Sequence, residues 1–258
     1  MPEESIFVVR GEQFNMKLTY KEDIFLMDKL FQLKSITDQS KEISDETLAC
    51  LKQKVIIVFG GSYGIGLEIC KICRKAGAHI YSFSRTTGVD VSDALAVKNT
   101  FINVYAKEKR IDCVINTAGI LDKEPLVNMN YEKSIDVNYL GAVIVAKEAY
   151  MYLKESSGSL LLYTSSSYTR GRSLYSLYSS SKAAVVNLIQ ALSEEWYASK
   201  IRINCINPER TKTPMRIKNF GKEPDESLLD PQTVAIVSLN TVLSNMTGEI
   251  IDIKHQIK

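Results

Sequence analysis

The sequence has only two histidines and an odd number of cysteines, five, in 258 residues. His79 and His255 are too few and too far apart in the chain to indicate a histidine-based metal centre. A chain of this length can bury a core without covalent cross-links, so we expect reduced thiols and no disulfide framework. Cys70 and Cys73 have the spacing of a redox or metal pair, but they fall in a predicted helix with no second pair nearby. We interpret them as core residues and predict no metal site.

Long apolar runs and an excess of one charge are also missing. No apolar run approaches the roughly 20 residues of a membrane span, and the acidic start lacks the basic and apolar parts of a secretory signal. The 32 basic and 30 acidic residues are mixed along the chain and give a net charge of +2, which does not suggest nucleic-acid binding. We therefore expect a cytoplasmic protein with a small-molecule substrate and without a membrane or nucleic-acid partner.

What the sequence does contain, from residue 54 onward, is an alternation of short apolar runs with longer helical patterns. The expected strands are 55–59, 79–83, 111–115, 159–164, 201–206 and 248–253, and the expected helices are 65–76, 93–108, 136–154 and 178–196. Such alternation is typical of a parallel sheet covered by helices on both faces. The predicted fold class is α/β, a Rossmann-type doubly wound parallel sheet with a small N-terminal appendage.

The first fifty residues do not follow this alternation. Segments 6–9 and 16–19 resemble strands, and residues 20–33 resemble a helix with a capping box formed by Thr19 and Glu22. The polar stretch 37–46 is interpreted as a linker. The predicted organisation is therefore an appendage at 1–50 and a main domain at 51–258.

A glycine-rich turn follows the first strand of the main domain. Gly60, Gly64 and Gly66 stand between an apolar strand and a helix, where glycines allow the backbone to approach a pyrophosphate and the helix N-terminus attracts its charge. We include Ser62, Tyr63 and Ile65 from the same turn in the predicted cofactor site. A structural tight turn is the alternative.

The residues after the second strand select the cofactor in folds of this kind. An acid there binds the ribose hydroxyls of NADH, whereas an arginine accommodates the 2′-phosphate of NADPH. Ser84 and Arg85 occupy this position and no acid does, so we predict NADPH in preference to NADH. The alternative is that Arg85 is a solvated loop residue.

Tyr178 and Lys182 are four residues apart in a predicted helix, with Ser165 thirteen positions before Tyr178. A tyrosine acts as an acid near neutral pH only if its pKa falls from about 10, and a lysine on the same helix face supplies the cation that lowers it. Tyr175 is a rival acid, but its distance of seven residues from Lys182 does not fit, so we assign it to the substrate rim or to packing.

Residues 54 to about 215 resemble the short-chain dehydrogenase/reductase family. The family motif Thr-Gly-x-x-x-Gly-x-Gly is matched by residues 59–66, with Phe59 in place of the threonine. The segment 207–215 resembles the family's Pro-Gly…Thr-Pro-Met segment, with Glu209 in place of the glycine, a change that affects the local loop geometry. The resemblance adds Asp90, Val91, Asn116, Ala118, Gly119, Pro208 and Thr213 to the predicted cofactor site, together with Tyr178 and Lys182, and it adds Asn138 to the catalytic set.

The resemblance also implies a mechanism and an assembly. The cofactor reduces a carbonyl carbon while Tyr178 protonates the oxygen and Ser165 hydrogen-bonds to it. Lys182 binds the nicotinamide ribose and lowers the pKa of Tyr178, and Asn138 holds a water that connects Lys182 to solvent. Helices 136–154 and 178–196 resemble the pair that forms the family's four-helix interface, so a homodimer or homotetramer is expected.

Basic residues follow two neighbouring strands, and both loops should open above the carboxyl ends of the sheet. They are Arg170 and Arg172 in one loop, and Arg210, Lys212, Arg216 and Lys218 in the other. A phosphate or carboxylate on the substrate explains such a set. Of these we predict Arg170, Arg172, Arg210 and Lys212 as substrate residues, and the alternative is solvated surface charge. Little apolar lid lies between residues 214 and 228, which argues against a steroid or long acyl substrate.

Residues 9–23 resemble the C-terminal end of sugar-phosphate cytidylyltransferases, where a Gly…Asn-x-Lys-x-Thr…Asp segment leads into the last helix. Some bacterial bifunctional proteins join such a domain to a reductase that converts D-ribulose 5-phosphate to D-ribitol 5-phosphate, which becomes CDP-ribitol for capsule and surface polysaccharides. By this resemblance we expect that reaction, a cytidylyltransferase partner, and no cytidylyl transfer by this chain alone. An unrelated extension is the alternative for residues 1–50.

Two other functions remain open at the sequence level. One is a general short-chain reductase of 3-oxoacyl or other small carbonyl substrates. The other is a non-catalytic nucleotide-binding scaffold, against which the set Ser165, Tyr178 and Lys182 speaks.

Overall fold

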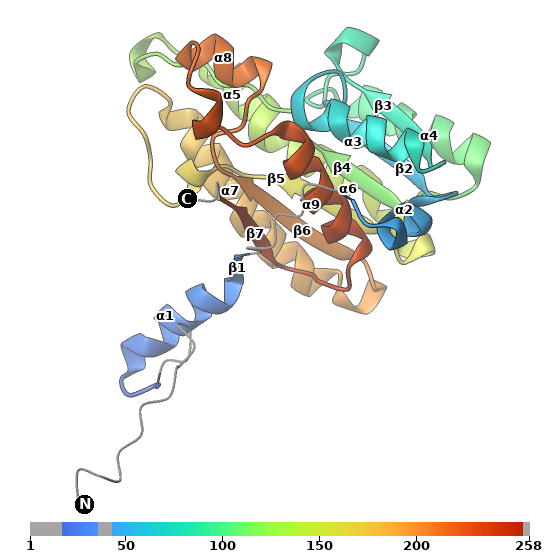
Figure 1. Ribbon diagram of the computed structural model, residues 1–258, viewed down its shortest axis with the longest axis horizontal. Helices are drawn as coiled ribbons and strands as arrows, with labels where there is room; N and C mark the ends of the chain where they lie inside the picture. Colours follow the sequence, from blue (N-terminus) through green and yellow to red (C-terminus); the bar gives the residue numbers. More distant parts are fainter. Residues whose placement is uncertain (1–16, 36–42, 255–258) are drawn as a thin grey trace, which may run out of the picture.

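The computed structural model describes residues 17–35 and 43–254, and within them it confirms the α/β prediction (Figure 1). Seven strands form one sheet in the order β1-β7-β6-β5-β4-β2-β3, and every neighbouring pair is parallel. The strands are β1 Leu33–Ser35, β2 Val55–Phe59, β3 His79–Phe83, β4 Cys113–Asn116, β5 Ser159–Tyr163, β6 Arg202–Pro208 and β7 Ile250–Ile253. From β2 the chain runs to β3 on one side and then to β4 on the other, which creates a crevice at the carboxyl ends of these strands.

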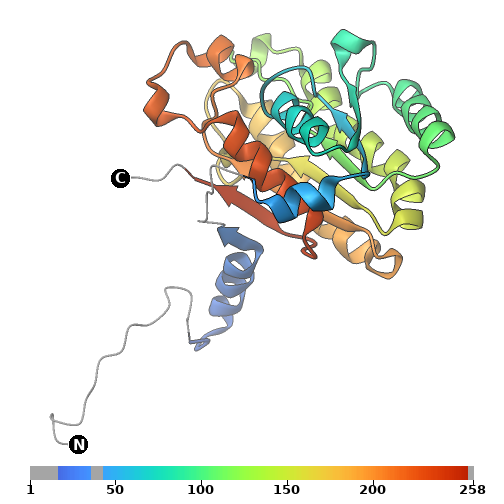
Figure 2. The same ribbon diagram turned by 45° about the vertical axis from the view of Figure 1, so that its right-hand side comes forward.

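Helices cover both faces of the sheet (Figure 2). They are α1 Lys21–Gln32, α2 Asp45–Leu51, α3 Gly64–Lys75, α4 Ala94–Glu108, α5 Tyr131–Ile135, α6 Gly141–Ser156, α7 Ser176–Glu195, α8 Pro214–Phe220 and α9 Pro231–Leu243. Helices α4, α6 and α7 pack on one face, and α2, α3 and α9 pack on the other. No helix in the described part of the chain is both long and apolar enough to cross a lipid bilayer.

Strand β2 shows why the apolar runs form a central sheet. Val55, Ile57 and Phe59 face the α4–α6–α7 side, and Ile56 and Val58 face the α2–α3–α9 side. All five are at most 2% exposed, so successive side chains contribute to two cores in turn. Full burial of each such side chain stabilises the fold by about 1.5–3 kcal/mol.

The expected helix 136–154 is divided in the structure. Helix α5 ends at Ile135, a π-helical turn spans Asp136–Leu140, and α6 begins at Gly141. Asn138 lies in the π-helical turn, and its side chain bonds to the backbone of Ile120 in the loop after β4. Single π turns of this kind occur frequently at functional sites. The sequence pattern shows helical periodicity but not this local widening.

The N-terminal region has the predicted helix but a different cap. Helix α1 matches the expected helix 20–33, whereas the carboxylate of Asp23 accepts hydrogen bonds from the backbone N–H groups of Thr19 and Tyr20, both at 2.8 Å. This arrangement replaces the expected box of Thr19 and Glu22. The expected strand 6–9 and His255 lie outside the described residues, and no strand forms at residues 17–19.

Two elements connect the N-terminal region to the main domain. Strand β1 pairs in parallel with β7, so that α1 projects from this edge of the sheet (Figures 1 and 2). Helix α2 begins within the expected linker and packs on α9, where the Thr47 hydroxyl donates to Asn240 Oδ1 at 2.9 Å and Leu51 is fully buried. Residues 37–42 of that linker lie outside the described residues. The boundary at residues 50 and 51 stays a prediction.

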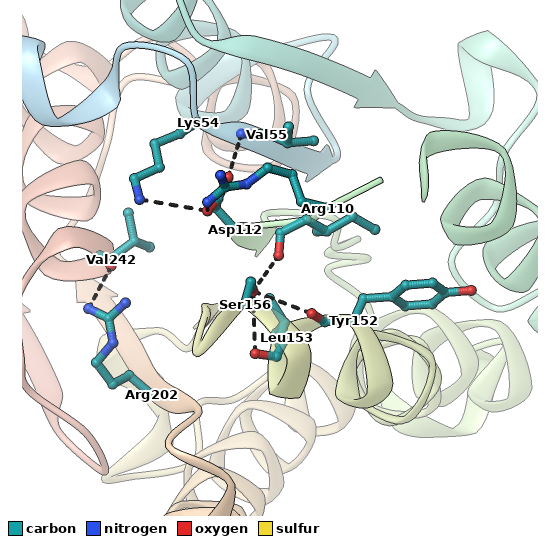
Figure 3. A network of polar contacts seen from close by, with 10 residues as sticks. Lys54, Val55, Arg110, Asp112, Tyr152, Leu153, Ser156, Arg202 and Val242 are labelled. Atoms are coloured by element: carbon teal, nitrogen blue, oxygen red, sulfur yellow. Dashed lines mark hydrogen bonds and ion pairs between the residues drawn. The ribbon is translucent and has the colours of Figure 1, made fainter. Parts of the chain in front are cut away.

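A polar network holds the amino ends of the strands together (Figure 3). The buried carboxylate of Asp112 accepts a hydrogen bond from the Val55 N–H at 2.8 Å, and it pairs with Arg110 and, at 3.6 Å, with Lys54. Nearby, the Ser156 hydroxyl donates to the Ile111 carbonyl at 2.6 Å, which ties α6 to the segment entering β4. The network fixes the strands at the end opposite the crevice.

Candidate active site

A cavity of about 400 Å³ opens at the carboxyl ends of β2, β4, β5 and β6. It lies in the crevice that the strand order creates, where ligands bind in open α/β sheets. Most of the predicted cofactor and catalytic residues line it: Gly60, Ser62, Tyr63, Gly64, Ile65, Gly66, Ser84, Arg85, Asp90, Val91, Ala118, Gly119, Ser165, Tyr178, Lys182, Pro208 and Thr213. Segments that are more than 150 residues apart in sequence therefore meet at one site.

The glycine turn packs closely against residues 117 and 118, which follow β4, and no side chain at Gly60 or Gly66 would fit there. A Cβ on Gly60 would lie 2.6 Å from the Ala118 nitrogen, and a Cβ on Gly66 would lie 2.5 Å from the Gly60 carbonyl oxygen and from Thr117 Oγ1. The Thr117 hydroxyl donates to the Phe59 carbonyl at 2.9 Å, which ties β4 to the start of the turn. The turn and the N-terminus of α3 line the cavity together, and this geometry fits a pyrophosphate.

Three hydroxyl groups meet beside the glycine turn at the end of β3. The Oγ atoms of Ser62 and Ser84 are 2.6 Å apart, and each lies 2.8 Å from Thr86 Oγ1. Arg85 lies in the same turn and lines the same end of the cavity. Sequence reasoning identified Ser62, Ser84 and Arg85 but missed Thr86, although its position directly after Arg85 was a usable signal.

Asn116 and Asn138 support the site from outside the cavity lining. Asn116 Oδ1 accepts a hydrogen bond from the Ala118 N–H at 3.1 Å. Asn138 Oδ1 accepts from the Ile120 N–H and its Nδ2 donates to the Ile120 carbonyl, both at 2.9 Å. Oδ1 can accept one further hydrogen bond and Nδ2 can donate one more, so the expectation that Asn138 holds a water for Lys182 stays a prediction.

Lys182 is buried beneath the cavity. It is 5% exposed, its ammonium donates to the Tyr163 carbonyl at 3.0 Å, and it lies 5.6 Å from the centroid of the Tyr178 ring. Burial disfavours the charged form and lowers the pKa of Lys182 to about 8. This lysine thus titrates near physiological pH, unlike a lysine at the surface.

The structure corrects the expected direction of the Tyr178 pKa. Burial raises this pKa, the hydrogen bond with Ser165 lowers it, Tyr175 raises it, and the charge of Arg216 lowers it. Burial is the largest of these effects, and Lys182 is not among them. The sequence pattern places Lys182 beside Tyr178, but it does not show that both side chains lose most of their contact with water.

Three of the six cations in the two basic loops reach the cavity, namely Arg172, Arg210 and Arg216. The predicted substrate residues Arg170 and Lys212 do not line it, and neither does Lys218. Lys212 instead pairs with Asp225 at 2.7 Å, and Arg170 is exposed to solvent. Arg170 and Lys212 therefore lie outside the cavity lining of this structure, and their role in substrate binding stays a prediction.

Aromatic and charged side chains from α7 and α8 form the end of the cavity near Tyr178. The ring of Tyr175 packs edge-on against Phe220, with centroids 6.0 Å apart, and against Tyr178 at 6.4 Å. Arg216 bonds through two nitrogens to Glu223 and lies over the Phe220 ring at 3.8 Å. Sequence reasoning placed Tyr175 correctly at the rim but did not identify Phe220 or Glu223, whose roles depend on the path of the loop after α8.

The cysteine pair belongs to the core. Cys70 and Cys73 are fully buried on the α3 face, and burial raises the pKa of both thiols. Within the described residues, no three histidine, cysteine, aspartate or glutamate side chains gather closely enough to hold a metal ion. The geometry is that of packed thiols.

Comparisons with known proteins identify the family of the chain. The family model of the short chain dehydrogenases matches residues 85–224, which is just over half of the chain. The chain is 51% identical over 256 residues to the bifunctional ribulose 5-phosphate reductase/CDP-ribitol pyrophosphorylase of Haemophilus influenzae, and the match covers 98% of this chain and 54% of that protein. The chain therefore spans about half the length of this relative.

Two further proteins show the breadth of the similarity. The 3-oxoacyl-[acyl-carrier-protein] reductase of Chlamydia trachomatis is 31% identical over 190 residues, which cover 64% of this chain and 77% of that protein. The crystal structure of the 3-ketoacyl-(acyl-carrier-protein) reductase of Brucella melitensis, complexed with NADH, has a TM-score of 0.73 at 22% identity and covers 79% of this chain and 97% of that one. Together with the family match, these similarities show that the chain belongs to the short-chain dehydrogenase family of oxidoreductases.

Proposed function

We propose that this chain uses NADPH to reduce the phosphorylated keto-sugar D-ribulose 5-phosphate to D-ribitol 5-phosphate. The observation that carries the proposal is the 51% identity, over nearly the whole chain, to a protein whose name includes ribulose 5-phosphate reductase. Arginines at the end of the cavity next to Tyr178 support a phosphorylated substrate. Because the chain spans 54% of that relative, we restrict the proposal to the reductase reaction.

Ser165, Tyr178 and Lys182 are the proposed catalytic residues. A bound nicotinamide cofactor supplies the hydride that the carbonyl carbon accepts. Tyr178, kept protonated by burial, donates its proton to the carbonyl oxygen, which becomes the alcohol. The Ser167 hydroxyl donates to Ser165 Oγ at 3.2 Å and helps to orient it. The Ser165 hydroxyl, which bonds to Tyr178 in this structure, would turn its proton to the substrate oxygen where negative charge develops.

Lys182 holds a positive charge beneath the cofactor site. Its hydrogen bond to the Tyr163 carbonyl fixes the ammonium, which retains further N–H groups for the hydroxyls of a bound ribose. Reprotonation of Tyr178 needs a path from solvent. A Cβ on Gly119 would lie 3.2 Å from Asn138 Oδ1 and 3.7 Å from Lys182 Nζ, so we propose that this path runs beside the π-helical turn that contains Asn138.

The preference for NADPH rests on the end of β3. Arg85 and the hydroxyls of Ser62, Ser84 and Thr86 offer a cation and hydrogen-bond donors where an adenosine ribose would lie. The position lacks a carboxylate that would accept bonds from ribose hydroxyls and repel a 2′-phosphate. NADPH and sugar phosphates are both metabolites of the cytoplasm, and we place the reaction there.

We also propose that the enzyme is a homodimer or homotetramer. A groove between α6 and α7 is lined mainly by apolar side chains, including Val143, Tyr150, Leu188 and Leu192. Apolar helix faces of this kind form interfaces between copies of a chain.

The product, D-ribitol 5-phosphate, would pass to a cytidylyltransferase for CDP-ribitol and surface polysaccharide synthesis, which agrees with the second half of the relative's name.

A general 3-oxoacyl reductase is the second candidate, and the 31% identity to the Chlamydia trachomatis enzyme favours it. The loss of NADPH absorbance with D-ribulose 5-phosphate, D-ribulose and a 3-oxoacyl thioester separates the two. Turnover that is specific to the sugar phosphate supports the first function. Turnover of the thioester alone supports the second, and equal rates on D-ribulose and its phosphate contradict a phosphate-selective site.

A further inference from the structure

Arg216 occupies a special position among the cations of the basic loops. Its side chain is 21% exposed, whereas the exposed fractions of Arg210 and Lys212 are 60% and 49%. Its guanidinium lies over the Phe220 ring with Cζ 3.8 Å from the ring centroid, an arrangement that favours a planar cation. Arg216 is therefore held in one orientation while it lines the cavity.

Glu223 fixes this orientation from one edge of the guanidinium. Arg216 Nε donates to Glu223 Oε2 at 2.6 Å, and Nη2 donates to Oε1 at 2.9 Å. A guanidinium has five N–H groups in a rigid fork, and this carboxylate uses the Nε edge. The Nη1 edge, at which Nη1 and Nη2 each present one further N–H, keeps the geometry that suits two oxygens of a phosphate. Glu223 itself does not line the cavity, so it is a support and not a competitor within the site.

The position of Arg216 relative to Tyr178 fits a short substrate. The charge of Arg216 is close enough to lower the pKa of the Tyr178 hydroxyl. In D-ribulose 5-phosphate the phosphorylated carbon is three carbons from the carbonyl carbon, so the cation that binds the phosphate must lie near the proton donor. Arg172 and Arg210 line the same cavity and add positive charge there, and the carboxylate of Glu209 limits the excess.

We propose that Arg216 binds the phosphate of the substrate through its Nη1 edge, with Arg172 and Arg210 beside it, and that Glu223 is a positioning residue that aims the guanidinium. This inference rests on the proposed reduction of a phosphorylated keto-sugar. In this proposal the selectivity for phosphate depends on Arg216 in α8 and on Glu223 in the segment that follows. Arg170, Lys212 and Lys218 do not bind the phosphate.

The test compares D-ribulose 5-phosphate with D-ribulose in steady-state kinetics of the wild-type chain and four variants. Arg216→Ala should raise KM for the phosphate by roughly 10- to 100-fold, the range for losing charge-assisted hydrogen bonds, and should change KM for D-ribulose by less than about threefold. Arg216→Lys should retain part of the selectivity, because a lysine keeps the charge but not the fork. Glu223→Gln should raise KM for the phosphate less than Arg216→Ala does and leave kcat unchanged. Lys218→Ala, a basic residue of the same helix outside the cavity lining, is the matched control and should behave as wild type.

Calorimetry with D-ribitol 5-phosphate and D-ribitol, at saturating NADP⁺, gives a readout that does not depend on turnover. The affinity ratio of these two ligands should fall in Arg216→Ala and remain in Lys218→Ala, with equal NADP⁺ binding as evidence that the variants fold. A wild-type chain that does not prefer phosphorylated ligands contradicts the proposed function itself. A wild-type chain that prefers them, together with an Arg216→Ala variant that keeps this preference, overturns only the proposal that Arg216 binds the phosphate.

Discussion

The amino ends and the carboxyl ends of the sheet contain the same kinds of charged side chains in different arrangements. At the amino ends, Lys54 and Arg110 surround the buried carboxylate of Asp112, so each charge has a partner (Figure 3). At the carboxyl ends, Lys182 is 5% exposed and its bonded partner is the neutral carbonyl of Tyr163. Here the charge faces a cavity, and no acidic side chain among residues 17–35 and 43–254 forms an ion pair with it.

The difference between the two ends indicates which charged residues stabilise the fold and which can take part in catalysis. Asp112 bonds to the Val55 backbone and so links β2 to the segment entering β4. Lys182 also bonds to a strand, but burial without an acidic partner lowers its pKa to about 8, which a purely structural lysine does not require. Substitutions at the two ends should therefore separate stability from activity.

The largest effect is expected for Tyr178→Phe at the carboxyl end. Loss of the proton donor should lower kcat by a factor of about 10² to 10⁴, with little change in melting temperature or NADPH binding. Stopped-flow or steady-state NADPH oxidation measures the loss. Tyr175→Phe is the matched control, because this neighbouring ring packs at the rim, and it should keep most of the activity. A Tyr178→Phe variant with more than a tenth of wild-type kcat would revive the non-catalytic reading of this residue.

The cofactor end of the same cavity should respond next. Arg85→Ser should raise KM for NADPH by about 10- to 100-fold and leave KM for NADH within about threefold, because only NADPH has a phosphate for the guanidinium. The ratio of the two KM values is the measurement. Lys98→Ser, on the surface of α4, controls for a change of net charge. A wild-type enzyme with a tenfold preference for NADH is inconsistent with the proposed cofactor.

The pH dependence sharpens the comparison at Lys182. Its folded pKa of about 8 is below the usual lysine value, so the ammonium loses its proton as the pH rises through about 8. Burial raises the pKa of Tyr178, so this proton donor stays protonated over the same range. For the free enzyme, kcat/KM for reduction should be level below about pH 7 and should fall about tenfold per pH unit well above 8. Lys182→Arg should move this fall to higher pH, and an unchanged profile in that variant would assign the transition to another group.

The smallest effect on activity is expected at the amino ends. Asp112→Ala should lower the free energy of unfolding by about 1–3 kcal/mol, because the buried Val55 N–H loses its acceptor, and should leave kcat and KM unchanged. Urea denaturation measures the loss. Asp225→Ala, which removes an exposed pair with Lys212, should lower the free energy of unfolding much less, because solvent screens this pair. Equal losses in the two variants would contradict the role of the buried network.

The sequence predicted the parts of the site that depend on local spacing. The glycine turn follows β2 directly, and Tyr178 and Lys182 are one helical turn apart in α7, so their proximity needs no knowledge of the rest of the chain. The strand pattern was sufficient for strands β2 to β7 and for the carboxyl-end crevice, but it did not predict β1, which adds to the edge of the sheet beside β7. The paths of the loops were not predictable, so the sequence did not distinguish Arg216, which lines the cavity, from Arg170 and Lys212, which do not.

The burial of the Tyr178 and Lys182 side chains could also not be predicted from the sequence. The spacing of Tyr178 and Lys182 indicates that they are neighbours, but their pKa directions depend on how much water the surrounding elements exclude. The pair of Arg216 and Glu223 could not be predicted for a related reason, because the six residues between them include the end of α8 at Phe220 and a change of direction at Gly221. Contacts across such breaks depend on the folded loop.

The three hydroxyls at the end of β3 form a closed ring, and counting their protons shows what such a ring can do. Ser62, Ser84 and Thr86 have one hydroxyl proton each, and three contacts of 2.6–2.8 Å use all three protons. A phosphate oxygen that arrives as a pure acceptor must take one of these protons, so the ring opens. A ribose hydroxyl can donate its own proton to the closed ring. NADPH and NADH would thus leave these three hydroxyls in different hydrogen-bonding states, and this difference would distinguish the two bound forms.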